Sequence, residues 1–223
     1  MSSLTFIPDL AVILKYTAAV LVLFALPGPD MILCLSKTMT HGRRAAFSCQ
    51  VGISCGLLVH TFLAAFSVSA ILAASETAFF ILKIMGALYL IWLAISVLRS
   101  GSELNINPNG QEKASVAPTF RRNFLTGLGI NLANPKVVLF FITFLPQFVS
   151  AADPHAQGKL VFLGMFFVVF TAPLMCLLIM VAHNLTSLLK RNPKVLRAVD
   201  YLFAGVFVSF AVGLLFTENG GQR

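Results

Sequence analysis

The chain has 223 residues, of which 58% are hydrophobic and only 11% are charged. Water-soluble globular domains carry about 25% charged residues, so this composition excludes a soluble enzyme and indicates an integral membrane protein. The hydrophobic residues lie in runs of about 20, the length of helix that crosses a bilayer, rather than alternating as they do in membrane barrels. We therefore predict an all-α integral membrane protein.

Six hydrophobic runs predict six transmembrane helices. In chain order they cover residues 8–26, 45–74, 77–98, 124–149, 160–182 and 195–216. A secretory signal peptide needs a basic stretch before its apolar core, but residues 1–10 contain no Lys or Arg and carry Asp9. We therefore expect the first run to be a permanent span.

The net charge of +8 would suggest a nucleic-acid partner in a soluble protein. Here most of the 16 basic residues lie in the first, third and fifth connections between spans. They are Lys37, Arg43 and Arg44, then Arg99, Lys113, Arg121 and Arg122, and finally Lys190, Arg191, Lys194 and Arg197. Because basic connections stay in the cytoplasm, we expect both termini outside. No stretch interleaves basic with aromatic residues, so we expect no nucleic-acid partner.

Two of the spans contain proline at corresponding places in the two halves of the chain. The breaks consist of Pro27, Gly28, Pro29 and Asp30 in the first span, and of Asn134, Pro135 and Lys136 in the fourth. Proline removes a backbone donor, and the freed peptide groups are tolerated in a membrane only where protein or a watery cavity satisfies them. Matching breaks predict a substrate site, although packing kinks or a first span that ends at Pro27 are simpler alternatives.

These breaks predict an inverted repeat of three spans plus three within a single membrane domain. Residues 1–98 form the first three-helix repeat, 99–123 a cytoplasmic linker, and 124–223 the second three-helix repeat. The linker contains Gly-Ser-Glu and Asn-Pro-Asn-Gly, and it is too short and polar to fold alone.

Five sequence strings stand out: Pro27-Gly-Pro-Asp-Met, His41-Gly-Arg-Arg, Asn134-Pro-Lys, Phe140-Phe and Phe144-Leu-Pro-Gln-Phe148. Together these strings resemble the lysine-exporter (LysE) superfamily. The closer similarity is to the homoserine/threonine efflux (RhtB-type) branch of bacterial amino-acid exporters, and it covers nearly the whole chain. This resemblance implies an inner-membrane exporter of amino acids or close derivatives that is driven by the proton-motive force. It does not select the amino acid.

Asp30 and Lys136 are the charged residues attached to the breaks. Each would cost about 2.5 to 3.5 kcal/mol at mid-helix if it had no partner. We therefore expect the two breaks to meet, with Asp30 and Lys136 pairing or holding the two ends of a zwitterionic substrate. The simpler alternative is that Asp30 caps the resumed helix while Lys136 extends to the membrane interface.

Other polar residues in the spans are candidates for the same site. Asn131, Asn134 and Gln147 could bind a zwitterion or satisfy the carbonyls that Pro135 frees. His60 shares a helix face with Gly52 and Gly56, where the glycines permit close packing. It is a candidate proton relay or a hydrogen-bonded structural residue. We expect substrate and protons as partners, within the bilayer.

The alternative function is an intramembrane thiol-redox carrier, which needs a cysteine near each break. Cys34 follows the first break, but residues 124–150 contain no cysteine, so we disfavour this function. The sequence has no CxxC pair, no His/Cys cluster at metal spacing and no GxxxxGK loop, so we expect no enzyme, metal or cofactor. Small-residue helix faces leave a homodimer open.

Overall fold

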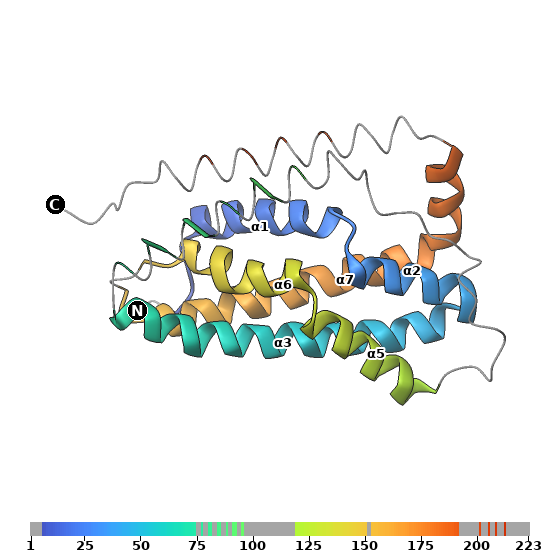
Figure 1. Ribbon diagram of the computed structural model, residues 1–223, viewed down its shortest axis with the longest axis horizontal. Helices are drawn as coiled ribbons and strands as arrows, with labels where there is room; N and C mark the ends of the chain where they lie inside the picture. The colour runs from blue at the N-terminus through green and yellow to red at the C-terminus, as the bar shows by residue number, and fades with distance from the viewer. Residues whose placement is uncertain are drawn as a thin grey trace.

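The computed structural model describes residues 6–74, 119–150 and 153–191, with scattered positions within 77–95 and 201–212. Every element in these ranges is helical, and none of them contains a strand. The helices lie along one long axis as an elongated bundle (Figure 1). The prediction of an all-α membrane protein is thus confirmed for the described part of the chain.

Two long helices correspond to the predicted second and fifth spans. Helix α3 covers Arg43–Ala74 and helix α7 covers Ala156–Arg191. Within them, Arg43–Ser67 and Ala156–Ala182 are long and apolar enough to cross a membrane. Helix α7 continues past the predicted end at residue 182, since residues 183–191 contain no proline or glycine.

The predicted first and fourth spans are broken helices. Helix α1 (Leu10–Ala25) and helix α2 (Pro29–His41) meet at an angle of 52°. Helix α5 (Phe120–Leu132) and the segment Pro135–Phe148 meet at 51°. That segment comprises α6 (Pro135–Leu139), a π-helical turn η1 (Phe140–Phe144) and a 3-10 turn η2 (Leu145–Phe148). The two broken spans run in opposite directions (Figure 1), and each bent pair is long enough to be one span.

The predicted third and sixth spans are described only at scattered positions, all of them helical. Most of the predicted linker at 99–123 lies outside the described residues. Its last residues are already helical, because Thr119 caps the start of α5 by accepting a hydrogen bond from the Arg122 backbone N–H at 3.4 Å. The six-span count and the repeat remain predictions.

Helices α3 and α5 pack with their backbones in close contact. A Cβ added at Gly52 would lie 2.0 Å from the Phe124 carbonyl oxygen, and one added at Gly127 would lie 2.1 Å from the Cys49 carbonyl oxygen. Only glycine fits at either point. The close approach expected on the glycine face of α3 is confirmed, and it fixes α5 beside His60.

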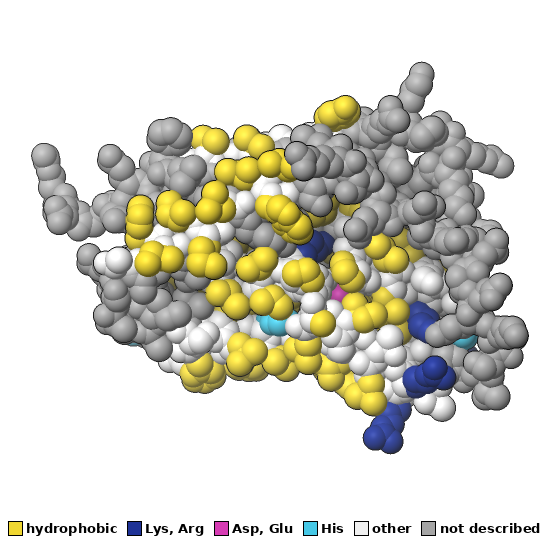
Figure 2. Space-filling model, viewed as in Figure 1, with side chains coloured by type: hydrophobic (Ala, Val, Ile, Leu, Met, Phe, Trp, Pro, Cys, Tyr) yellow, Lys and Arg dark blue, Asp and Glu magenta, His cyan; other side chains and the backbone are white. Residues whose placement is uncertain are grey.

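Hydrophobic side chains cover most of the described surface in Figure 2, as lipid contact requires. Basic side chains gather toward the right-hand end of that view, where α2 ends and both α3 and α5 begin (Figures 1 and 2). Helix α7 also ends on this side of the bundle (Figure 1). The described residues of the first connection and of the start of α5 therefore lie at the same end of the molecule.

Candidate functional site

The first break leaves a carbonyl without its usual helical donor. Pro27 lacks the N–H that would bond the Leu23 carbonyl one turn earlier. Lys136 replaces it, because its Nζ donates to the Leu23 oxygen at 3.1 Å and to the Leu26 oxygen at 2.7 Å. Lys136 therefore binds the C-terminal end of α1. This differs from the simpler alternative, in which its side chain would extend to the membrane interface.

The second break has the same defect and a different partner. Pro135 cannot bond the Asn131 carbonyl, which accepts instead from the Asn134 backbone N–H at 3.0 Å. His60 Nε2 lies 3.3 Å from the same oxygen. Since a carbonyl only accepts, Nε2 must carry the proton in this contact. The ring of His60 also lies beside Phe141, with centroids 5.8 Å apart.

A side-chain hydrogen bond joins the two breaks directly. Asn131 Nδ2 donates to Asp30 Oδ2 at 2.8 Å. Asp30 lies in the first turn of α2, but that helix begins after Gly28 without a side-chain cap, so Asp30 does not act as the cap. No ion pair joins Asp30 to Lys136, both of which the structure describes. The breaks thus meet through Asn131 and Lys136, each reaching the other half.

A small, partly open cavity of about 50 Å³ lies where the breaks meet. Its polar and charged lining residues are Asp30, Lys136, Gln50 and Thr171, and the rest of its wall is apolar. The apolar lining residues are Leu23, Phe24, Met31, Ile53, Leu57, Val137, Phe167 and Met175. Pockets for small molecules usually enclose about 300 Å³ or more, so this cavity must widen to admit an amino-acid-sized ligand. Figure 2 shows acidic, basic and histidine side chains within an otherwise apolar face.

Three buried polar atoms at the breaks have no hydrogen-bond partner. They are Asp30 Oδ1, Asn131 Oδ1 and Asn134 Nδ2, and the Asn134 side chain lies close enough to interact with the Asp30 carboxylate. Buried polar atoms are normally bonded, so these groups have hydrogen-bonding capacity that a ligand or an ordered water could use. Asp30 offers an acceptor for an ammonium group, whereas Lys136 and Asn134 offer donors for a carboxylate.

The amides of the fourth span have different roles. Asn134 Oδ1 caps α6 by accepting the Lys136 backbone N–H at 3.0 Å. Gln147 Nε2 donates to the Thr143 carbonyl at 3.0 Å, and Gln147 does not line the cavity. The structure therefore brings Asn131 and Asn134 to the break and leaves Gln147 at the far end of the span.

The sequence analysis did not select Gln50, which lines the cavity from α3. Its side chain is 5% exposed. Its Oε1 accepts from Cys34 Sγ at 3.9 Å, and its Nε2 donates to Ser54 Oγ at 3.2 Å. Gln50 is the one amide in the hydrophobic run 45–74, and that signal was available in the sequence.

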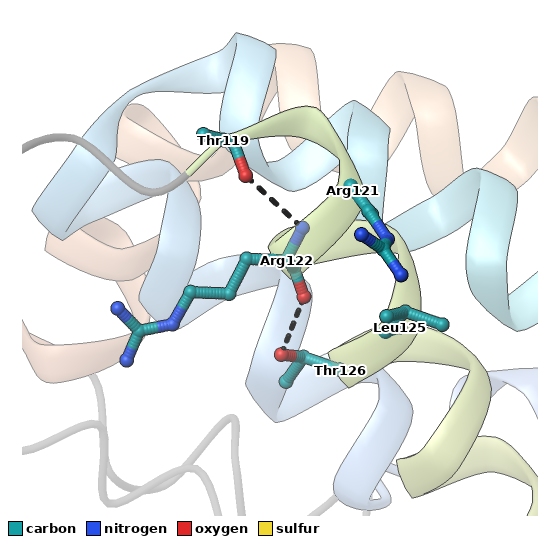
Figure 3. Close-up of a pocket in the computed structure, with 5 residues that line it drawn as sticks. All are labelled: Thr119, Arg121, Arg122, Leu125 and Thr126. Atoms are coloured by element: carbon teal, nitrogen blue, oxygen red, sulfur yellow. Dashed lines mark hydrogen bonds between the residues drawn. The ribbon is translucent and has the colours of Figure 1, made fainter.

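A larger hollow of about 440 Å³ lies at the start of α5, away from the breaks. Both Arg121 and Arg122 line this hollow; Arg121 lies beside Leu125, and the Arg122 side chain extends in the other direction (Figure 3). The Thr126 hydroxyl donates to the Arg122 carbonyl at 2.8 Å. The hollow belongs to the basic end of the bundle and contains neither Asp30 nor Lys136.

Comparison with known protein families shows which class of membrane protein this chain belongs to. Residues 21–218 match the LysE type translocator family over most of the chain. The chain belongs to the LysE type translocator family. It is therefore a transporter rather than an enzyme, and the resemblance found in the sequence is confirmed. All four cysteines are free thiols, including Cys34 beside the first break.

Curated relatives include two efflux proteins. The chain is 30% identical over 200 residues to an uncharacterized membrane protein of Vibrio cholerae, covering 90% of this chain and 94% of the relative. It is 29% identical over 182 residues to the homoserine/homoserine lactone efflux protein of Salmonella typhimurium, covering 82% and 85%. It is 26% identical over 201 residues to the leucine efflux protein of Klebsiella pneumoniae, covering 90% and 93%. These names agree with the homoserine/threonine efflux branch. No solved structure matches the chain.

Proposed function

We propose that this translocator is a secondary exporter that moves a neutral amino acid out of the bacterial cytoplasm across the inner membrane. The meeting of the two breaks at one cavity carries this proposal, because acceptor and donor groups for a zwitterion lie there among apolar side chains. The efflux names of relatives in the same family support an amino-acid substrate.

In this proposal the two breaks hold opposite ends of the substrate. Asp30 Oδ1 accepts hydrogen bonds from the α-ammonium group, and Asn131 orients that carboxylate through its bond to Oδ2. Lys136 Nζ, whose side chain lines the cavity, donates to the α-carboxylate, and Asn134 Nδ2, which is buried but does not line the cavity, donates to it once the cavity widens. Gln147 has no part in this arrangement because its amide donates to the Thr143 carbonyl at the far end of the span.

The cavity wall supports a neutral substrate side chain. The charged residues that line it are Asp30 and Lys136, which the substrate backbone would occupy. A charged side chain would then lie unpaired among Leu, Ile, Phe and Met residues, at a cost of several kcal/mol. We therefore expect leucine-like or small hydroxyl-bearing amino acids to compete for transport and lysine or glutamate to compete poorly.

Amino-acid counterflow in proteoliposomes tests the proposed site. Asp30→Asn removes the acceptor charge and Lys136→Met removes the donor charge, so we expect each to slow exchange by at least about tenfold. The matched controls are Asp9→Asn and Lys15→Met, which change exposed residues of the same types near or within α1. Normal exchange by both site variants, or no exchange of any neutral amino acid by the wild type, would defeat the proposal.

We further propose that export is driven by the proton-motive force and that His60 relays the proton. His60 is 7% exposed and contacts the carbonyl of Asn131, whose amide binds Asp30, so a chain of hydrogen bonds links it to the site. A His60→Gln variant can still donate to that carbonyl but cannot titrate. We expect its exchange to lose its pH dependence, while the surface control His155→Gln keeps it. An unchanged pH profile in His60→Gln would leave His60 with a structural role alone.

We also propose the inverted three-plus-three repeat with both termini outside. The near-equal bends of the two broken spans, their opposite directions and the basic end formed by α2, α3 and α5 support this topology. A C-terminal alkaline phosphatase fusion should be active and a fusion truncated within 99–118 should be inactive. The reverse pattern would invert the topology.

A further inference from the structure

The C-terminal end of α1 is a site for a cation. Its last carbonyls carry the negative end of the helix dipole, and Pro27 and Pro29 remove backbone donors beyond it. In many transporters with broken helices, such helix ends and unwound carbonyls coordinate the coupling cation, Na⁺ or H⁺. In this chain the Leu23 and Leu26 oxygens are both bonded to Lys136 Nζ.

Gly28 leaves room for this ammonium group beside the first break. Gly28 has φ −140°, an ordinary extended conformation, so the advantage of glycine here is space beside Lys136 rather than backbone freedom. A Cβ there would lie 3.1 Å from Lys136 Nζ and 3.2 Å from its Cε. The absence of that Cβ lets the lysine side chain pass the break and reach the end of α1.

The charges in the cavity also indicate that the end of α1 holds the Lys136 ammonium group as it would hold a cation. Of the residues that line it, Asp30 and Lys136 are the charged ones. Asp30 is bonded to Asn131, and it forms no ion pair with Lys136. The ammonium group is thus held mainly by backbone oxygens of α1, in the manner of a bound ion, while Asp30 keeps one oxygen unpartnered.

We propose that Lys136 Nζ is a built-in cation that fills the alkali-ion site of the first break, so that this exporter neither binds nor needs Na⁺ there. The inference goes beyond the proposed function, because it concerns a cation site that exists with or without substrate. It predicts that removal of the lysine side chain creates a site for a small free cation.

Thermal unfolding of the purified protein tests the site without any substrate. We expect the wild type to have the same Tm in NaCl and in choline chloride, since choline is too large for the site. In Lys136→Ala, Na⁺ or methylammonium should raise the Tm saturably, by about 3 °C at concentrations well above Kd. The matched variant Lys136→Met fills the same space without charge and should respond to neither cation.

Two results would overturn the inference. One is a saturable rise of the wild-type Tm with Na⁺, which would show an alkali site beside the intact lysine. The other is a folded Lys136→Ala protein whose Tm responds to neither cation. If that variant does not fold, counterflow by the wild type still tests the inference. We expect the wild-type exchange rate to change by less than about twofold when choline replaces Na⁺. A requirement for Na⁺ would refute the inference. An absence of amino-acid exchange would defeat the proposed function, while the Tm measurements would still decide the cation site.

Discussion

Replacement of Gly56 by alanine tests whether the contact between Asn131 and Asp30 is needed for transport. A Cβ at Gly56 would lie 2.3 Å from Asn131 Oδ1 and 2.9 Å from its Cγ, whereas ordinary contacts begin at 3.4 Å. The amide must therefore move by about 1 Å, a displacement that can cost a functional site 100-fold. Two of the three nearest atoms, Oδ1 and Cγ, can move by rotation of the Asn131 side chain, whereas Cβ at 3.0 Å requires the helix backbones to separate by only a few tenths of an ångström.

The expected loss follows from the hydrogen bond that this movement breaks. Asn131 Nδ2 donates to Asp30 Oδ2 at 2.8 Å, and a hydrogen bond to a charged group contributes about 1.5 to 3 kcal/mol. If the contact orients the substrate site, the initial rate of counterflow in proteoliposomes should fall by about 10- to 100-fold. The amount of folded protein should be close to that of the wild type, as measured by size-exclusion chromatography.

Two further variants show whether the cause is the proposed one. Gly129→Ala is the matched control on α5, because a Cβ there meets nothing within 4 Å, and we expect normal transport. In a double variant with Asn131→Ala, the alanine at position 56 should reduce counterflow little further, because Asn131→Ala has already removed most of the side-chain atoms that this alanine would displace. Wild-type transport by Gly56→Ala, or losses that simply add in the double variant, would refute this reasoning.

Three other predictions follow from the geometry. Gly127→Ala forces a Cβ to within 2.1 Å of a backbone oxygen of α3, so the unfolding free energy should fall by about 1 to 3 kcal/mol, and an unchanged Tm would contradict the contact. Gly28→Ala meets Lys136 at 3.1 Å, which requires a shift of a few tenths of an ångström, so transport should fall several-fold in counterflow with little change in Tm. Lys159 donates a hydrogen bond to Asp153 and thereby holds the pKa of Asp153 below its ordinary value. That pair stabilises the fold above the ordinary Asp pKa of about 4 and is lost as the pH falls through the lower folded pKa. Tm values of wild type and Asp153→Asn should therefore differ at pH 7 and converge only below about pH 4.

The sequence by itself determined where the chain is broken and which charges lie at the breaks. Proline chemistry is local, so Pro27 and Pro135 identify the freed carbonyls of Leu23 and Asn131 by counting one turn back. The hydrophobic runs located the four candidate spans that the structure describes, with their ends within a few residues except at the first span, whose second part α2 continues to His41, and at the end of α7.

The sequence also contained signals that were not used or did not suffice. Gln50 stands out as a lone amide in an apolar run, but only the packing of α3 against α2 and α7 shows that it lines a cavity. Nothing in the apolar string Phe140–Phe144 distinguishes a π-helical turn from an α-helical one.

Only the tertiary structure decided which groups satisfy the breaks. The side-chain donors come from 71 to 113 residues away in the chain: His60 bonds the Asn131 carbonyl and Lys136 bonds the Leu23 carbonyl. Asp30 and Lys136 have opposite charges, which suggested a direct pair, yet each has its bonds to the other half's broken helix. The physical reason is that a proline's effect on its own helix is covalent and local, whereas the choice of donor depends on which helices the glycine contacts allow to approach.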